Sequence, residues 1–429
     1  RSYGMTFLPF LATKIKIPEG KRRSLPDYRF RYKYRDEWEI KSPRRVLLIN
    51  PVSGEMHRLD EAGKESVFGL RESVNGMELF NLTYFVVYYH QVITMGKVGY
   101  LFKIIKNMNY GQLFKTVEHV HKKTKKNKIS ILKDVVNCGL KYQAGYTDYR
   151  LFEMYNLNEK QRRTIVTRGI NNDLVKRYNN PEYKDYFNDR SKFNKKFHKY
   201  LERDWLIINN SEESFKEFKE FCEKHSTIIV KSVLKEQAKD VEIFKITKKN
   251  VKDIYNKLLK TKRCLVEEVA KQYESLSNLH PTSVNTFRII TLNQEIVAAY
   301  LCVGNNNNVV DDFNKEGLVA PINIETGIID YLAIDKEMNE YDRHPITNEA
   351  ILWFQIPKWP RIKRFVIQAS KEIPEIGYVG WDVSLNEKDP YLIGGNEYPE
   401  HDLYQLPPHR TDGIGLLPRF EQIMNKKGE

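Results

Sequence analysis

The stretch YVGWDVSLNEKDPYLIGGNEYP covers residues 378 to 399. Two largely apolar runs flank a polar segment that contains Asn, Asp and Pro, so the stretch predicts two strands joined in a hairpin. Asp382 lies on the first predicted strand and Asn396 at the end of the second. Mg²⁺ takes few protein oxygens and keeps room for phosphates and water. Two oxygen ligands that face each other across a hairpin therefore predict a site for Mg²⁺ and the phosphates it bridges.

The chain before this hairpin alternates between helix and strand patterns from about residue 190. Apolar residues recur at three and four spacing in SEESFKEFKEFCEKH, in KKNVKDIYNKLLK and in the segment after Pro360, which predicts amphipathic helices. Strands are predicted for TIIVKSV, VEIFKI and RCLVEEV, and a hairpin for TFRIITL with EIVAAYLCVG. INIETGIIDYLAI predicts a further hairpin that turns at Thr326-Gly327. This order predicts an α+β fold.

The N-terminal third has a different pattern. Residues 1 to about 45 are rich in Arg, Lys, Tyr and Pro and suggest an extended arm, and VLLINP (46 to 51) predicts a short strand. Residues 98 to 170 have helical periodicity, interrupted by the basic run 119 to 128, for which a solvated loop is predicted. The aromatic segment 79 to 92 predicts a buried core or an oligomer contact, with membrane-surface contact as the alternative.

Composition narrows the classes of protein. The chain has 429 residues, a formal net charge of +14 and 41% hydrophobic residues, which suits a protein with a sizeable core and anionic partners. Its four cysteines lie far apart without a CxxC pair, which favours the reducing cytoplasm over a disulfide scaffold. No apolar run approaches the roughly 20 residues that span a bilayer. The 26 tyrosines and the charge leave nucleic-acid binding open, but no nucleic-acid-binding motif supports it.

Four residues before the hairpin carry candidate chemistry. Lys231 ends a predicted buried strand, where its ammonium can reach a phosphate oxygen. Glu267 and Glu268 end another strand, where they are either solvated or accept hydrogen bonds from an adenine amino group or from ribose. Arg288 lies mid-strand between apolar neighbours, where an unpaired charge is costly. It therefore needs an anionic partner, which is either a protein carboxylate or a phosphate.

The order of these features resembles the sugar-transfer-associated branch of the ATP-grasp superfamily. The most specific pieces are INIETG with the later HPIT, VGWDVSL and GGNEYPEHDLYQLPPHR, and GYTDYRLFEMYNLNEKQRRTIVTRG, FNKKFHKYLERDW and LHPTSVNTFRIITL match more loosely. The resemblance covers about residues 130 to 420. It implies two α+β lobes around a nucleotide cleft, preceded by a helical and irregular N-terminal region. The expected divisions are 1–130, a helical lead-in at 131–190 and an ATP-grasp domain at 191–429.

The resemblance also implies roles for single residues. Lys231 and Arg190 would contact phosphates, and Arg288 would meet the transferring phosphoryl group. Further implied positions are Glu267, Glu268 and Val269 at the adenine, Glu268 or Glu274 at the ribose, and Asp382 and Asn396 on Mg²⁺, with Glu397 as a further metal ligand. ATP and Mg²⁺ are the implied cofactors.

Three departures from the family pattern affect the site. The segment KSVLKEQAKDVEIF lacks the glycines that let a backbone approach phosphate closely, so Lys235 or Lys239 is expected to cover the nucleotide instead. The central loop has Asp311-Asp312 and Glu316-Gly317 in place of Asp-Asn and Gly-Gly. Gly394 stands where a glutamate would bind the metal.

Two functions remain open. The first is a ligase that phosphorylates a carboxylate with ATP so that an amine or another nucleophile attacks the acyl phosphate, with a small molecule or a glycan as substrate, in polysaccharide or secondary-metabolite synthesis. The second is a degenerate ATP-grasp domain that binds a substrate, a glycan or a partner without turnover. A Gly394 introduced to disable the enzyme is a third account, which the glycine-free loop does not support.

Overall fold

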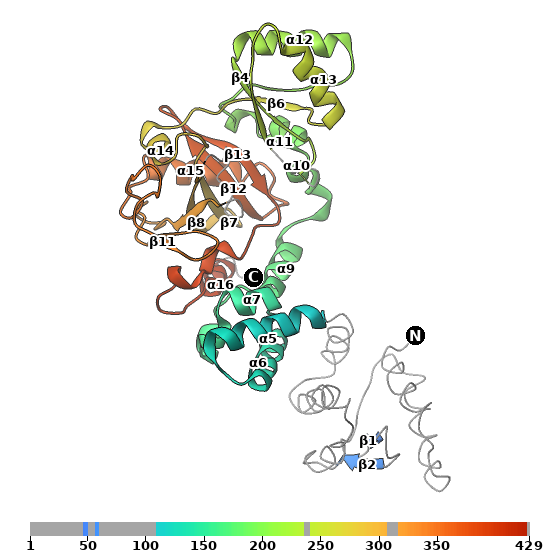
Figure 1. Ribbon diagram of the computed structural model, residues 1–429, viewed down its shortest axis with the longest axis vertical. Helices are drawn as coiled ribbons and strands as arrows, with labels where there is room; N and C mark the ends of the chain where they lie inside the picture. The colour runs from blue at the N-terminus through green and yellow to red at the C-terminus, as the bar shows by residue number, and fades with distance from the viewer. Residues whose placement is uncertain (1–45, 50–55, 60–108, 236–240, 307–315, 427–429) are drawn as a thin grey trace, which may run out of the picture. The chain divides into compact units, whose positions relative to one another are not determined.

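The computed structural model describes residues 46–49, 56–59, 109–235, 241–306 and 316–426 (Figure 1). The chain forms two compact units, Arg1–Val136 and Asn137–Glu429. The predicted aromatic contact segment at 79 to 92 and the helical pattern at 98 to 108 lie outside the described residues.

In the first unit, strand β1 (Val46–Ile49) pairs antiparallel with β2 (Met56–Leu59), which confirms the strand predicted in VLLINP for its first four residues. Helix α5 (Tyr110–Thr124) follows, and α6 (Lys128–Tyr142) crosses the boundary between the units. The loop predicted for the basic run 119 to 128 is wrong for its first half, because α5 continues to Thr124. Buried Leu113, Val117 and Val120 recur at helical spacing and hold these residues in the helix.

The second unit begins with a helical segment. Asn158, Thr167 and Asp189 each accept a backbone N–H at the start of a helix, which explains where α8, α9 and α11 begin. The α-helices are α7 (Tyr146–Leu151), α8 (Glu159–Arg162), α9 (Arg168–Tyr178), α10 (Asp185–Asn188) and α11 (Arg190–Lys196). In the described part of this unit, the 3-10 helices are η5 (Met154–Asn156), η6 (Pro181–Tyr183), η7 (His198–Tyr200), η10 (Leu403–Gln405) and η11 (Pro407–His409).

A four-stranded antiparallel sheet follows, with the order β3-β6-β4-β5. Its strands are β3 (Trp205–Ile207), β4 (Thr227–Lys231), β5 (Glu242–Lys245) and β6 (Leu265–Glu268). Helices α12 (Glu212–Lys224) and α13 (Val251–Thr261) lie beside β4 and β6 in Figure 1. Phe218, Ile228, Leu258 and Val266 form the core between these helices and the sheet. The strands and helices predicted for this part are confirmed.

The larger sheet has seven antiparallel strands in the order β11-β10-β9-β8-β7-β12-β13. Its strands are β7 (Thr286–Leu292), β8 (Glu295–Val303), β9 (Leu318–Pro321), β10 (Ala333–Ile334), β11 (Glu340–Tyr341), β12 (Tyr378–Leu385) and β13 (Pro390–Asn396). The two predicted hairpins β7–β8 and β12–β13 are confirmed. At the first of them, Asn293 and Gln294 both have positive φ, as a tight hairpin turn requires.

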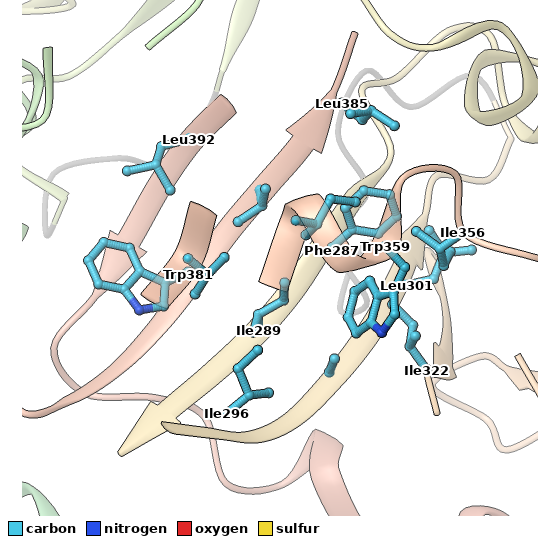
Figure 2. Packing of buried hydrophobic residues seen from close by; sticks show 14 of the residues in the cluster. Phe287, Ile289, Ile296, Leu301, Ile322, Ile356, Trp359, Trp381, Leu385 and Leu392 are labelled. Carbon is cyan, nitrogen blue, oxygen red and sulfur yellow. The ribbon is translucent and has the colours of Figure 1, made fainter. Parts of the chain in front are cut away.

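Both faces of the larger sheet are covered, which explains why β8 is apolar without interruption. On one face, helix α15 (Trp359–Ala369) packs against side chains of β7, β8, β12 and β13. Figure 2 shows Trp359 of this helix with Phe287, Ile289 and Trp381 of the sheet. On the other face lie residues of α9 and of α16 (Leu417–Lys426). Helix α14 (Glu274–Leu279) leads into β7.

The hairpin predicted for INIETGIIDYLAI is wrong in its strands. A turn does form there, since Gly327 N donates to Asn323 O at 2.7 Å and Gly327 has a φ of +76°. The residues on either side do not pair as strands, because Ile328 and Ile329 bond to the segment around Phe354 instead. Alternation alone could not reveal this competing partner.

Candidate functional site

Two of the predicted site residues, Arg288 and Asp382, lie in one row with Gly394 across three neighbouring strands. Arg288 of β7 lies opposite Asp382 of β12, and Asp382 lies opposite Gly394 of β13. Arg288 Nε donates to Asp382 Oδ1 at 2.5 Å, and its Nη1 donates to Glu400 Oε2 at 2.9 Å. Burial alone lowers the pKa of the Arg288 guanidinium, but Asp382 and Glu400 outweigh it and raise that pKa. The partners of Arg288 in this structure are therefore protein carboxylates.

A second group of charges surrounds Glu267 of β6, whose side chain is 3% exposed. Its Oε2 accepts from Lys231 Nζ at 2.5 Å, and its Oε1 accepts from Arg203 Nη2 at 3.2 Å and from Asn194 Nδ2 at 3.1 Å. Burial by itself raises the pKa of the Glu267 carboxyl, but Arg203 and Lys231 outweigh it and lower that pKa. Glu267 is thus an ionised carboxylate that two cations share.

Lys231 and Arg190 lie beside this carboxylate. Burial lowers the pKa of the Lys231 ammonium, and Glu267 opposes the shift without cancelling it. Burial likewise lowers the pKa of Arg190, again opposed by Glu267. Arg190 begins α11 and fixes the end of β4, because its Nη1 donates to Ser232 O at 2.8 Å and its backbone N to Val233 O at 2.9 Å. The structure therefore brings Arg190, Lys231 and Glu267 together.

Arg203 is a site residue that the sequence analysis missed. Its side chain is 2% exposed, and besides Glu267 it donates to the β13 carbonyls of Leu392 at 2.5 Å and Ile393 at 3.2 Å. It thereby links the four-stranded sheet to the edge strand of the larger sheet. Its position within FNKKFHKYLERDW, a segment used for the family resemblance, was the signal available in the sequence.

Lys235 connects the two groups of charges. Its ammonium donates to the carbonyl of Gly395 on β13. Burial lowers its pKa to about 8, while Asp382 and Glu397 act in the opposite direction and Arg190 and Arg288 lower it further. Charges from both groups, Arg190 beside Glu267 and Asp382 beside Arg288, therefore act on the Lys235 ammonium.

The three residues predicted to bind Mg²⁺, which are Asp382, Asn396 and Glu397, offer carboxylate and amide oxygens. Asp382 Oδ1 is bonded to Arg288, while its Oδ2 has no hydrogen-bond partner among the described residues and faces position 394. Asn396 Oδ1 accepts from Tyr398 N at 3.1 Å where the chain bends after β13. Glu397 is buried beyond this bend, and its Oε1 accepts from Asn188 at 3.1 Å. Carboxylate and amide oxygens are the donors that Mg²⁺ prefers.

The other predicted nucleotide contacts lie apart from this cluster. Glu268 accepts from Asp204 N at 3.2 Å and its Oε1 lies 3.9 Å from His225 Nδ1, while Val269 is half-buried just after β6. Glu274 is exposed at the start of α14. Neither glutamate has a hydrogen bond or ion pair with Lys231 or Arg288 in the described part of the chain. Their adenine and ribose contacts stay predictions, as does the nucleotide cleft.

No helix of the described residues is both long enough and apolar enough to cross a membrane. The predicted oligomer or membrane-surface contact through residues 79 to 92 stays a prediction, since that segment is not described.

Several solved structures are similar to this chain. They include the ATP-grasp ligase PsnB complexed with minimal precursor, Mg and ADP, at 11% identity and a TM-score of 0.34, where the match covers 59% of this chain and 62% of that chain. D-alanine–D-alanine ligase from Bacillus anthracis matches at 11% identity and a TM-score of 0.30 over 62% and 69% of the two chains. D-cycloserine synthetase DcsG matches at 8% identity and 0.33, over 57% and 71%. The chain thus spans less than two thirds of the PsnB structure.

A comparison with curated protein sequences found no match. A family model described as sugar-transfer associated ATP-grasp matches residues 169–425, which is more than half of the chain. The predicted family and the predicted α+β fold of the ATP-grasp class are confirmed. The chain with this cluster of buried cations and carboxylates belongs to the sugar-transfer associated ATP-grasp family.

Proposed function

We propose that this protein is an ATP-dependent carboxylate ligase. In the proposed reaction, an oxygen of the substrate carboxylate attacks the γ-phosphorus of ATP, and the bond from that phosphorus to the β,γ-bridging oxygen breaks to release ADP. An amine or another nucleophile then attacks the acyl carbon and phosphate leaves. Such phosphoryl transfer depends mainly on positioning the reactants and on neutralising the charge of the phosphates. The cations of the charge cluster can do both.

The observation that carries this proposal is the surplus of buried and half-buried positive charge around Glu267. This single carboxylate attracts three cations, which are Arg190, Arg203 and Lys231. Burial makes the charged form of Lys231 costly, and one shared carboxylate does not offset that cost. An anionic ligand would offset it. The phosphates of a nucleotide carry the required charge and accept charge-assisted hydrogen bonds from Lys and Arg.

The proposed roles follow from the contacts described above. Lys231 and Arg190 would bind phosphates, with Glu267 orienting the Lys231 ammonium. Arg288 would exchange Asp382 for the transferring phosphoryl group. Asp382, Asn396 and Glu397 would hold Mg²⁺, which neutralises phosphate charge when it is bound. Release of Asp382 by Arg288 would free both oxygens of that carboxylate for the metal.

The adenosine would lie at the end of β6. Glu267, Glu268 and Val269 are the proposed adenine residues, and Glu268 or Glu274 the ribose residue. The backbone around Val269 leaves the sheet here, so its N–H and C=O are candidates to bond the edge of the base. Glu267 already bonds Lys231 and Arg203, so its part at the adenine would be to link the base to the phosphate site.

The substrate class is a carboxylate of a glycan or of a small molecule such as an amino acid. Support comes from the family description, which associates these domains with sugar transfer, and from the formal net charge of +14, which suits an acidic substrate. A cytoplasmic location is part of the proposal, and the four cysteines of the chain are free thiols, as a reducing compartment would keep them.

One observation favours the second candidate function, a domain that binds without turnover. Position 394 carries no side chain opposite Asp382, and Arg288 already neutralises Asp382. A site in this state has one carboxylate fewer for a metal than the family pattern provides. In this reading the cation cluster would bind an acidic glycan or partner.

Hydroxylamine trapping separates the two candidates. The full chain is incubated with Mg·ATP, hydroxylamine and a panel of uronic acids and amino acids, because hydroxylamine converts an acyl phosphate to a stable hydroxamate. A ligase forms hydroxamate and ADP in equal amounts with at least one carboxylate, and Asp382→Ala abolishes both. Absence of hydroxamate for every acid, together with binding of acidic glycans that Asp382→Ala leaves intact, would support the binding module.

A further inference from the structure

Position 394 is open toward the metal residues. A Cβ at position 394 would lie 3.7 Å from Asp382 Oδ2, and apart from its chain neighbours it would have no other heavy atom of the described residues within 4 Å. A side chain could therefore begin at position 394 on the side of Asp382 without a clash at its Cβ. The glycine leaves this position without an oxygen ligand opposite Asp382.

The ammonium of Lys235 donates to the carbonyl of Gly395, the residue that follows Gly394 on β13. The carboxylates that act on its charge are Asp382, opposite position 394, and Glu397, just after β13. The ammonium thus adds a positive charge beside the proposed metal ligands.

The position of Lys235 is set by contacts before it in the chain. Arg190 binds Ser232 O through its side chain and Val233 O through its backbone. Asp189 and Leu234 form an isolated antiparallel bridge. The residues that lead to Lys235 are therefore tied to the start of α11, which distinguishes this lysine from a freely moving surface side chain.

We infer that the site takes one divalent cation with each nucleotide instead of two, and that Lys235 supplies the positive charge of the second. Two metal ions at a phosphoryl-transfer site lie about 3.5–4 Å apart and need carboxylates that can reach both. Asp382 Oδ2 and the oxygen of Asn396 suffice for one ion. The second place is taken by an ammonium, which can approach the same phosphate oxygens as a compact charge. This inference rests on the proposed function, since it requires nucleotide binding.

The same arrangement accounts for the glycine-free segment after β4. Glycines let backbone N–H groups approach phosphate closely, and this segment has none. In this inference the side chain of Lys235 reaches the phosphates and replaces those backbone N–H contacts. The lysine of this segment and the glycine on β13 therefore meet in one place, because Lys235 bonds the carbonyl of Gly395, next to Gly394.

The test counts metal ions. The full chain is titrated with Mn²⁺ in the presence of saturating β,γ-imido ATP, a non-hydrolysable analogue, and bound Mn²⁺ is measured by electron paramagnetic resonance. The proteins compared are wild type, Lys235→Ala, Gly394→Glu, the double variant, and Lys195→Ala, which removes an exposed lysine of α11 as a matched control. Thermal unfolding of each protein shows that it is folded.

We expect one Mn²⁺ per bound nucleotide in wild type and in Lys195→Ala, and two in the double variant. Lys235→Ala alone should keep one Mn²⁺ and weaken nucleotide binding by about tenfold, the order expected for one charge-assisted hydrogen bond. Two Mn²⁺ in wild type, or one in the double variant, overturns the inference and leaves the proposed function standing. Absence of nucleotide binding in every protein overturns both.

Discussion

At the scale of the residue, Arg288 determines how the carboxylates of the site are paired when no nucleotide is bound. Its guanidinium bonds Asp382 and Glu400, and the side chain of Arg288 is 23% exposed. The sequence required an anion beside this arginine but could not choose between a carboxylate and a phosphate. That choice depends on the strand register that places Asp382 opposite Arg288, which is a property of the folded sheet.

Replacing Arg288 tests this pairing. Arg288→Gln leaves Asp382 and Glu400 close together without their shared cation, so we expect the free energy of unfolding without nucleotide to fall by about 1–3 kcal/mol, less than for a fully buried pair. Urea unfolding of the two proteins measures the difference. Arg364→Gln, which removes an exposed arginine of α15, serves as the control and should change stability little. Equal stability of both variants would contradict the assigned role.

At the scale of the element, strand β13 presents two different faces through adjacent glycines. A Cβ on Gly394 would meet Asp382 Oδ2 at 3.7 Å, which is ordinary contact. A Cβ on Gly395 would lie 3.0 Å from the rings of both Phe187 and Phe193. One glycine thus opens the charged site, and the other allows α10 and α11 to pack closely on the strand.

The two glycines should respond differently to alanine. Gly395→Ala crowds two aromatic rings and should lower the free energy of unfolding by roughly 1–3 kcal/mol, the usual cost of overpacking. Gly394→Ala should leave stability unchanged or raise it by up to about 1 kcal/mol, since the unfolded chain loses freedom. Thermal unfolding of the pair is a matched comparison. A Gly394→Ala that destabilises as much as Gly395→Ala would show that position 394 is not open.

Most elements of the second unit could be predicted from local pattern. TIIVK alternates between half-buried and buried residues as its sequence suggests, and β7, β8, β12 and β13 follow the predicted hairpins. The failures have a common cause. The residues of INIETG bond to a segment about 30 positions away. The lysines at the end of α5 are helical because buried Leu113 and Val117 stabilise that helix.

The site was predictable as a set of residues but not as a set of pairs. Lys231, Glu267, Arg288 and Asp382 were expected to bind a ligand, and in this structure they bond one another or their neighbours. Arg203 was missed because its partners, Glu267 and two carbonyls of β13, come from distant parts of the chain. Such long-range pairs depend on how two sheets meet, which a single sequence does not state.

At the scale of the second unit, Arg203 and Glu267 join the two sheets. Arg203→Met leaves Glu267 buried with a single cation and removes the bonds to Leu392 and Ile393, so we expect a loss of about 3–5 kcal/mol in the free energy of unfolding. Arg150→Met, at an exposed position of α7, is the control. Arg203→Met/Glu267→Gln should recover part of the loss, because the unpaired charge is gone. A double variant less stable than Arg203→Met would argue against this link between the two sheets.

Acid stability should depend on His409. Burial lowers the pKa of His409 from 6.5 to about 4, and its Nε2 bonds Leu332 O at 2.9 Å. Between these two pKa values the unfolded chain binds more protons than the folded one, so stability is full above pH 6.5 and falls as the pH drops toward 4. The loss should reach roughly 3 kcal/mol. His409→Gln keeps a donor without the titration, so unfolding measured from pH 7 to pH 4 should be less steep in that variant. Identical slopes would refute this contribution.

The central claim is that the cation cluster around Glu267 binds the phosphates of Mg·ATP. Calorimetric titration of the full chain with ATP, with and without Mg²⁺, tests it most directly. We predict one ATP site that is stronger with Mg²⁺, and an affinity at least about tenfold lower in Lys231→Ala, the order for one lost charged contact. Lys195→Ala, the exposed control on α11, should bind as wild type does. No binding of Mg·ATP by either wild type or Gly394→Glu, or equal binding by wild type and Lys231→Ala, would contradict the account.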